Sequence, residues 1–229
     1  MAVDLRMLLE GRALLGGRPQ DAPGTWPVAV VTMELQRGVM GDLASFPDLA
    51  DAVRSTEVVP KTARLLDAAR RARVPVVHCT AEFRPDRAGT VANTPLHSAV
   101  LRRADHLLAG TPATELVPEI GPLPGDVVIA RAHGVSPFTG TCLDATLRNL
   151  GVRTLVVAGV SVNLGVLGLC IEAVNLGYQV ALPVDAVTGV PLTYAESVVH
   201  TTLALIATLT TVEAVAQTLA EGSAPSPAR

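Results

Sequence analysis

Charged side chains follow two apolar runs of the sequence and could together carry out acid–base chemistry. Glu34 comes directly after the run Val28–Met33, and Arg131 comes directly after the run Asp126–Ala130. A carboxylate in such a position can act as a general acid or a general base. An arginine does not shuttle protons, but its guanidinium can bind a carboxylate through two hydrogen bonds. These residues predict a site that binds an anionic group and moves a proton, or else a salt bridge without turnover.

A third apolar run leads into the segment Ser161–Gly165. The residues Leu155–Val166 predict a buried strand, a tight turn at Gly159 and the first turn of a helix. The N-terminus of a helix presents free backbone N–H groups, which can receive an oxygen that gains negative charge. A nucleophile is expected at such a turn, yet Val162–Gly165 contains none. Ser161 is the only nearby hydroxyl, and no His/Asp pair is in view to activate it.

Other polar and aromatic side chains near these strand ends are expected to contact a substrate. Gln36 lies two residues after Glu34, and His133 lies two residues after Arg131. His133 could bring positive charge toward Glu34, although a loop histidine without a metal partner is more often simply solvated. No ligand set at metal-binding spacing is recognisable, so neither a catalytic metal nor a cofactor is expected. The predicted substrate-binding residues are Gln36, His133, Phe138, Ser161 and Asn163.

The three cysteines and the single lysine offer few further candidates. Cys142 and Cys170 fall in predicted helices, where packing in the core is the expected role. Cys79 ends a predicted strand near the site, and a displaced nucleophile at this position is an alternative. Lys61 falls in a predicted helix and is expected to face solvent.

The elements that must position these residues alternate between strands and helices. Apolar, β-branched runs predict strands at 28–33, 74–79, 126–130, 154–158 and 178–183. Residues 39–54 predict a loop rich in Gly, Pro and Asp. Helical spacing predicts helices at 59–72, 98–108, 142–150, 164–176, 192–207 and 212–220. This alternation predicts an α/β fold, a three-layer doubly wound sheet that is mostly parallel. In such a sheet the carboxyl ends of the strands meet at one edge, where ligands bind.

Composition sets the class of protein. A chain of 229 residues with 49% hydrophobic residues can build one full core, and we expect one domain over 28–220. Residues 1–27 are interpreted as an N-terminal extension and 221–229 as a disordered tail. Because the net charge is −3, we expect the chain to bind neither nucleic acid nor a membrane surface. With no signal peptide or membrane span in the sequence, and no cysteine framework, we expect a cytoplasmic protein.

The order of short motifs over Ser136–Val187 resembles the isochorismatase-like cysteine hydrolase superfamily. The matching motifs are Ser-x-Phe, Gly-Thr-x-Leu, Gly-Val-x-x-Asn, Gly-Tyr and Asp-Ala, in that order, at residues 136–138, 140–143, 159–163, 177–178 and 185–186. The resemblance covers roughly residues 28–212. It implies a doubly wound sheet, a small-molecule substrate and assembly as a homodimer or homotetramer. Many members of the superfamily are amidases in which an Asp-Lys-Cys triad forms an acyl-enzyme.

The triad of the superfamily falls on changed residues in this chain. The aspartate of an Asp-x-Gln motif falls on Glu34, the lysine on Ala132 and the cysteine on Gly165. True isochorismatases also have glycine at the cysteine position, because hydrolysis of a vinyl ether needs no covalent intermediate. Arg131 and His133 flank Ala132, and either could replace the lysine if the loop is shifted by one residue. The resemblance also implies a cis peptide between Val160 and Ser161.

Two hypotheses follow. The first is a hydrolase of a small, anionic vinyl ether or amide that works without a covalent cysteine intermediate. In it Glu34 is the general acid or base, Arg131 binds the substrate, and the turn at Gly165 holds the polarised oxygen. The second is a catalytically degenerate member that serves as a small-molecule-binding or assembly protein, because all three triad positions have changed.

Overall fold

A single parallel sheet forms the centre of the molecule. The computed structural model describes residues 4–10 and 27–223. The strands are ordered β3-β2-β1-β4-β5-β6, and every pair of neighbours is parallel. β1, β2 and β4 are buried over their whole length, in keeping with their valine-rich sequences. The strand bounds are β1 Val28–Met33, β2 Val76–Ala81, β3 Val127–Arg131, β4 Thr154–Gly159, β5 Gln179–Pro183 and β6 Thr208–Thr210.

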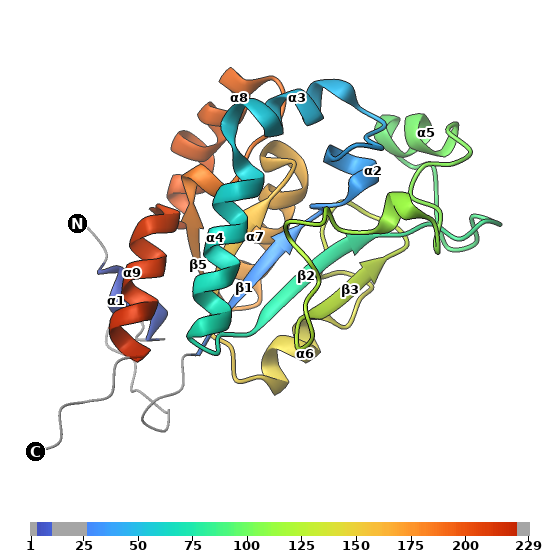
Figure 1. Cartoon of the computed structure of the whole chain (residues 1–229). Helices are drawn as coiled ribbons and strands as arrows, with labels where there is room; N and C mark the ends of the chain where they lie inside the picture. Colours follow the sequence, from blue (N-terminus) through green and yellow to red (C-terminus); the bar gives the residue numbers. More distant parts are fainter. Residues whose placement is uncertain (1–3, 11–26, 224–229) are drawn as a thin grey trace, which may run out of the picture.

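Helices cover both faces of the sheet, and α4 and α9 lie side by side on one of them (Figure 1). Val28 and Val30 of β1 pack toward this face, whereas Ala29, Val31 and Met33 pack toward the other. The helices of the first face are α1 Leu5–Leu9, α3 Pro47–Thr56, α4 Val58–Arg71 and α9 Val212–Ser223. Those of the second are α6 Leu143–Asn149, α7 Leu167–Asn175 and α8 Leu192–Ser197. The predicted three-layer, doubly wound α/β fold is therefore confirmed.

Short helical segments complete the chain, most of them near the carboxyl ends of the strands. In the described part of the chain, no helix is both long enough and apolar enough to span a membrane. The short helical segments are α2 Arg37–Met40, α5 Pro95–Leu101, η1 Pro112–Thr114, η2 Val162–Val166, η3 Val184–Ala186, η4 Val198–Thr202 and η5 Leu203–Leu205.

Several predicted boundaries differ from the structure. Residues 39–54 were expected to form a loop, but α3 begins at Pro47, and its buried Leu49 and Val53 are one helical turn apart. The helix expected at 98–108 is α5, which begins after Thr94, whose side chain accepts the backbone N–H of His97. β3 ends one residue later than expected and so includes Arg131.

Differences also occur toward the C-terminus. The helix expected at 192–207 is α8 followed by η4 and η5, and the short strand β6 was not expected. α9 runs to Ser223, three residues into the segment expected to be disordered, while 224–229 lies outside the described residues. Of the expected N-terminal extension, 1–3 and 11–26 likewise lie outside them. α1 packs onto the domain, with Leu8 and Leu9 buried.

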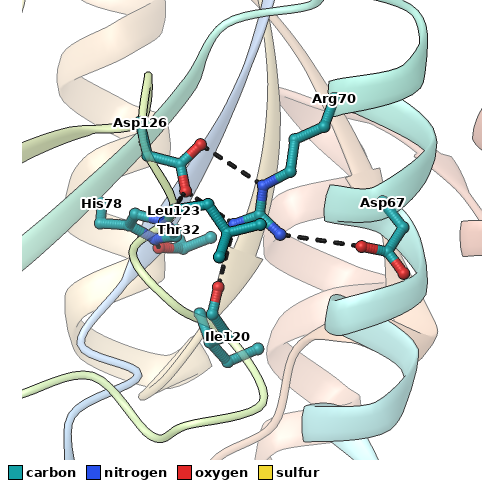
Figure 2. A network of polar contacts seen from close by, with 7 residues as sticks. All are labelled: Thr32, Asp67, Arg70, His78, Ile120, Leu123 and Asp126. Atoms are coloured by element: carbon teal, nitrogen blue, oxygen red, sulfur yellow. Dashed lines mark hydrogen bonds and ion pairs between the residues drawn. The ribbon is translucent and has the colours of Figure 1, made fainter.

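A buried polar network ties β1, β2 and α4 to the segment before β3 (Figure 2). Thr32 Oγ1 lies 2.7 Å from His78 Nδ1, and His78 Nε2 lies 3.4 Å from Asp126 Oδ2. Arg70 of α4 donates from Nη2 to Asp126 Oδ2 at 2.7 Å and to the Ile120 carbonyl at 3.0 Å. Because the paired charges lie in a buried region, removing one partner would leave the other uncompensated. The network fixes the 120–126 segment against the sheet.

Acid is expected to destabilise the protein through His78. Burial lowers the pKa of His78, so the unfolded chain takes up a proton at a higher pH than the folded chain does. The resulting stability is complete above the unfolded pKa of about 6.5 and is lost as the pH falls toward the folded pKa. We expect the free energy of unfolding, measured by urea titration, to fall between about pH 7.5 and about pH 5.

The variant His78→Gln is expected to be less stable at neutral pH but to lose less stability on acidification than the wild type. His200→Gln is the matched control, because His200 is exposed. An equal loss on acidification in the wild type and His78→Gln would contradict this assignment.

Candidate active site

A cavity of about 350 Å³ opens where β1, β3 and β4 end. Its lining includes five residues that the sequence singled out, contributed by three separate segments. They are Glu34, Arg131, Ser161, Asn163 and Gly165. The expectation that the three strand ends meet at one place is therefore met for these residues.

An ion pair between Glu34 and Arg131 lies in this cavity. Arg131 Nη2 lies 2.5 Å from Glu34 Oε1, and the two side chains are 7% and 17% exposed. Arg131 ends β3 in register with Ala81 of β2, while Glu34 follows β1, so the guanidinium reaches across the end of β2. Ala81, at the end of β2, also lines the cavity, and its side chain is only a methyl group, which leaves room for the guanidinium to pass. Because Arg131 belongs to the strand, the contact needs no shift of the loop.

Each partner of the ion pair has hydrogen-bonding capacity left. Arg131 Nε donates to the Gly134 carbonyl at 3.0 Å, but Nη1 is buried and has no hydrogen-bond partner in the described part of the chain. Among the described residues, Oε2 of Glu34 has no hydrogen-bond partner either. A buried guanidinium N–H without an acceptor is costly, and a ligand oxygen would relieve that cost.

The turn after β4 is held close to β1. Gly159 has φ +119°, and a Cβ there would lie 2.2 Å from the Met33 carbonyl oxygen, so only glycine allows this approach. The Val160–Ser161 peptide is cis, as the family resemblance implied. Ser161 Oγ donates to Asn163 Oδ1 at 2.6 Å, which removes the hydroxyl proton from any role with a catalytic base. The backbone N–H groups of residues 162, 164 and 166 bond to carbonyls within the protein.

Gly165 leaves space that the side chain of Met33 fills. A Cβ at position 165 would lie 2.8 Å from Met33 Cε and 3.4 Å from Met33 Cγ. Met33 is completely buried, so a larger side chain at 165 would have to displace the end of a packed side chain. This position is occupied by packing and not by a nucleophile.

Three predicted substrate-binding residues do not line the cavity. Gln36 is buried, and its amide donates to the Ala81 and Thr114 carbonyls at 3.0 and 2.9 Å while accepting the Ala81 N–H at 2.8 Å. It therefore joins the ends of β1 and β2. The ring of His133 lies against that of His97, with the centroids 4.8 Å apart and the planes tilted by 31°. Phe138 is buried against Tyr178 in the core on the α7 side of the sheet.

Other residues of the cavity were not predicted from the sequence. Phe46, Phe83, His97 and His106 all line it, and they come from α3's N-terminal flank, the loop after β2, α5 and the turn after α5. None belongs to a recognisable motif. The sequence contained one signal for His97. Thr94 and Pro95 are typical of a helix N-terminus, and a helix that begins there includes His97.

The cysteines and Lys61 do not line the cavity. Cys79 is buried, and its burial raises the pKa of the thiol to about 12, so it stays protonated at neutral pH. Burial raises the pKa of Cys170 to about 12 as well, whereas Cys142 is exposed. Lys61 Nζ donates to the Thr56 carbonyl at 2.8 Å, away from the cavity lining. Among the described residues, no three His, Cys, Asp or Glu side chains are grouped closely enough to hold a metal ion.

Comparisons with known proteins show the family of the chain and relatives of its fold. A family model described as an isochorismatase domain matches residues 28–214. The ureidoacrylate amidohydrolase RutB of Rhizobium rhizogenes is 31% identical over 189 residues, covering 75% of this chain and 75% of that protein. YwoC of Bacillus subtilis, an uncharacterized isochorismatase family protein, is 40% identical over 74 residues, or 32% of this chain and 39% of that protein. An isochorismatase family protein of Burkholderia thailandensis has a similar structure, with a TM-score of 0.70 at 27% identity, covering 87% of this chain and 100% of that chain.

Alkylation of the folded protein is expected to leave its activity unchanged. Iodoacetamide should modify Cys142 alone, because the thiols of Cys79 and Cys170 are buried and protonated. Mass spectrometry of peptides checks the sites, with urea-unfolded protein as the control in which all three react. Loss of activity that follows modification of Cys79 would instead support a displaced cysteine nucleophile.

Proposed function

The chain belongs to the isochorismatase family of hydrolases, and we propose that it hydrolyses a small amide without a covalent cysteine intermediate. The observation that carries the proposal is the contact of Glu34 with Arg131 inside the cavity, beside a turn that has glycine at position 165. An amide is favoured over a vinyl ether because the relative RutB, which matches three quarters of each chain, is named an amidohydrolase.

Glu34 would act as the general base. Oε1 is held by Arg131, while Oε2 is left to accept a proton from a water molecule. That water attacks the amide carbon as its proton moves to Glu34, and the carbonyl oxygen becomes an oxyanion. When the intermediate collapses, the C–N bond breaks and Glu34 returns the proton to the leaving nitrogen. A carboxylate that serves in turn as base and acid balances every proton.

Arg131 would stabilise the negative charge that develops on the carbonyl oxygen. Its Nη1 is a buried donor with no acceptor among the described residues, and Arg131 lines the same cavity as Glu34. A donor that is already in place stabilises an oxyanion without reorganisation, and such a donor is worth about 100-fold or more in rate. The backbone N–H groups of Asn163 and Gly165 are the candidates for a second donor. An anionic group of the substrate could use the same Nη1.

A binding role without turnover is the second candidate. It is favoured by the ion pair itself, because Arg131 already satisfies one carboxylate oxygen of Glu34 and neutralises its charge. In that case a small acid or amide would raise the melting temperature of the protein and yet remain intact during prolonged incubation.

Glu34→Gln is expected to lower kcat/KM by about 100-fold or more, because it removes the base but keeps the side chain's shape. The assay follows small amides, ureidoacrylate and isochorismate with both proteins by mass spectrometry. Glu115→Gln is the matched control, since Glu115 is an exposed glutamate that pairs with Arg37 outside the cavity lining. Equal rates of hydrolysis by the wild type and Glu34→Gln would contradict the proposal.

A further inference from the structure

Aromatic side chains are concentrated in the cavity although the chain as a whole has few of them. Only 3% of the residues are Phe, Trp or Tyr, and there are three phenylalanines. Two of these three, Phe46 and Phe83, line the cavity, and so do the imidazole rings of His97 and His106. The proposed chemistry at Glu34 and Arg131 gives none of these rings a role.

Phe46, Phe83 and His106 form a continuous aromatic wall. The His106 ring lies 6.0 Å from Phe46 at 77° and 5.9 Å from Phe83 at 32°, measured between centroids. These are normal geometries for aromatic pairs. Burial lowers the pKa of His106 to about 4, so the ring is uncharged at neutral pH. Its Nδ1 is satisfied by Ser45 Oγ at 2.9 Å, so the imidazole adds a planar, uncharged ring to the wall.

Cationic side chains fix the two phenylalanine rings. The Arg103 guanidinium carbon lies 4.8 Å from the centroid of Phe46, and that of Arg87 lies 5.4 Å from the centroid of Phe83. Each distance is within the range of a cation–π contact. Rings held in place before a ligand arrives lose little conformational entropy on binding, so the wall is preorganised.

The remaining surface of the cavity is also largely apolar. Val39, Leu49, Val100 and Leu107 contribute to it and are buried. The charged residues of the lining are Glu34 and Arg131, which form the ion pair, and the exposed Asp48 and Arg103, so the formal charges of the lining sum to zero. Binding energy must then come mainly from apolar and aromatic contact, with Arg131 Nη1 receiving a single oxygen.

We propose that the cavity selects small amides whose body is a planar apolar ring, that is, aryl or arylalkyl carboxamides and the acids they release. The ring packs against Phe46, Phe83 and His106, and the carbonyl oxygen meets Arg131 Nη1 beside Glu34. The inference builds on the proposed amide hydrolysis and names the substrate class for it. An open-chain amide could reach Arg131 but would leave the aromatic wall uncovered.

Matched ligands separate the contribution of the ring from that of the carbonyl group. Affinities of butanoate and 3-phenylpropanoate, and of butanamide and 3-phenylpropanamide, in which a methyl group takes the place of the phenyl ring, are measured by calorimetry and thermal shift. Each phenyl ligand is expected to bind at least 10-fold more tightly than its methyl counterpart, because the aromatic wall buries the ring. Equal affinities within a pair would overturn the proposal.

Variants of the phenylalanines test whether the aromatic wall causes the preference for phenyl ligands. Phe83→Leu and Phe46→Leu are expected to reduce the ratio of phenyl to methyl affinity about 5-fold or more by removing a ring–ring contact. Phe138→Leu is the matched control, because this third phenylalanine is buried outside the cavity lining. Phe46 is only partly buried, so its variant tests the wall even where Phe83→Leu fails to fold. An equal loss in Phe138→Leu would also overturn the proposal.

The two proposals fail in different ways. Tight binding of phenyl ligands without any turnover would contradict amide hydrolysis and leave the selection of a ring standing. Hydrolysis of short amides that depends on Glu34, without a preference for a phenyl group, would contradict the selection and leave the hydrolysis standing. Glu34→Gln is expected to keep the phenyl preference, because Glu34 does not belong to the wall.

Discussion

The ion pair of Glu34 and Arg131 is the interaction around which the site is organised. The two residues are separated by 97 positions in the sequence and meet because β3, β2 and β1 are adjacent and parallel. Burial of both side chains makes the pair costly to break, since either charge alone would be left uncompensated. The pair also leaves one buried donor on Arg131 and one oxygen on Glu34 without a hydrogen-bond partner among the described residues. The proposed hydrolysis requires these two groups, an acceptor for a proton and a donor for an oxyanion.

Neighbouring contacts hold the strand ends that carry this pair. The Glu34 N–H donates to the Cys79 carbonyl at 2.9 Å, and Gln36 bonds to both backbone groups of Ala81. Deeper in the sheet, the network around His78 fixes the 120–126 segment, which precedes β3 (Figure 2). On the other side, Gly159 lets the end of β4 approach Met33, and Met33 in turn fills the space beside Gly165. Gln36 therefore joins the ends of β1 and β2, and Gly165 leaves the space that Met33 occupies.

The fold could be predicted from the sequence because its central strands are long apolar runs that only a doubly covered parallel sheet can bury. The elements that were missed are short or peripheral. α3 follows a segment rich in turn residues, and β6 spans only Thr208–Thr210. The polar part of the cavity lining could be predicted because Arg131 ends β3, while Glu34 and Ser161 follow the ends of β1 and β4 within two residues. The aromatic wall could not, because Phe46, Phe83 and His106 come from connecting segments without periodicity, and only tertiary packing brings them together.

A crystal structure of Glu34→Gln with bound 3-phenylpropanamide tests the central claim most directly. The account predicts the carbonyl oxygen within hydrogen-bond distance of Arg131 Nη1 and the amide carbon facing the side chain at position 34, with the phenyl ring against Phe46 and Phe83. An amide bound outside this cavity, or one bound within it without contact to Arg131, would contradict the account.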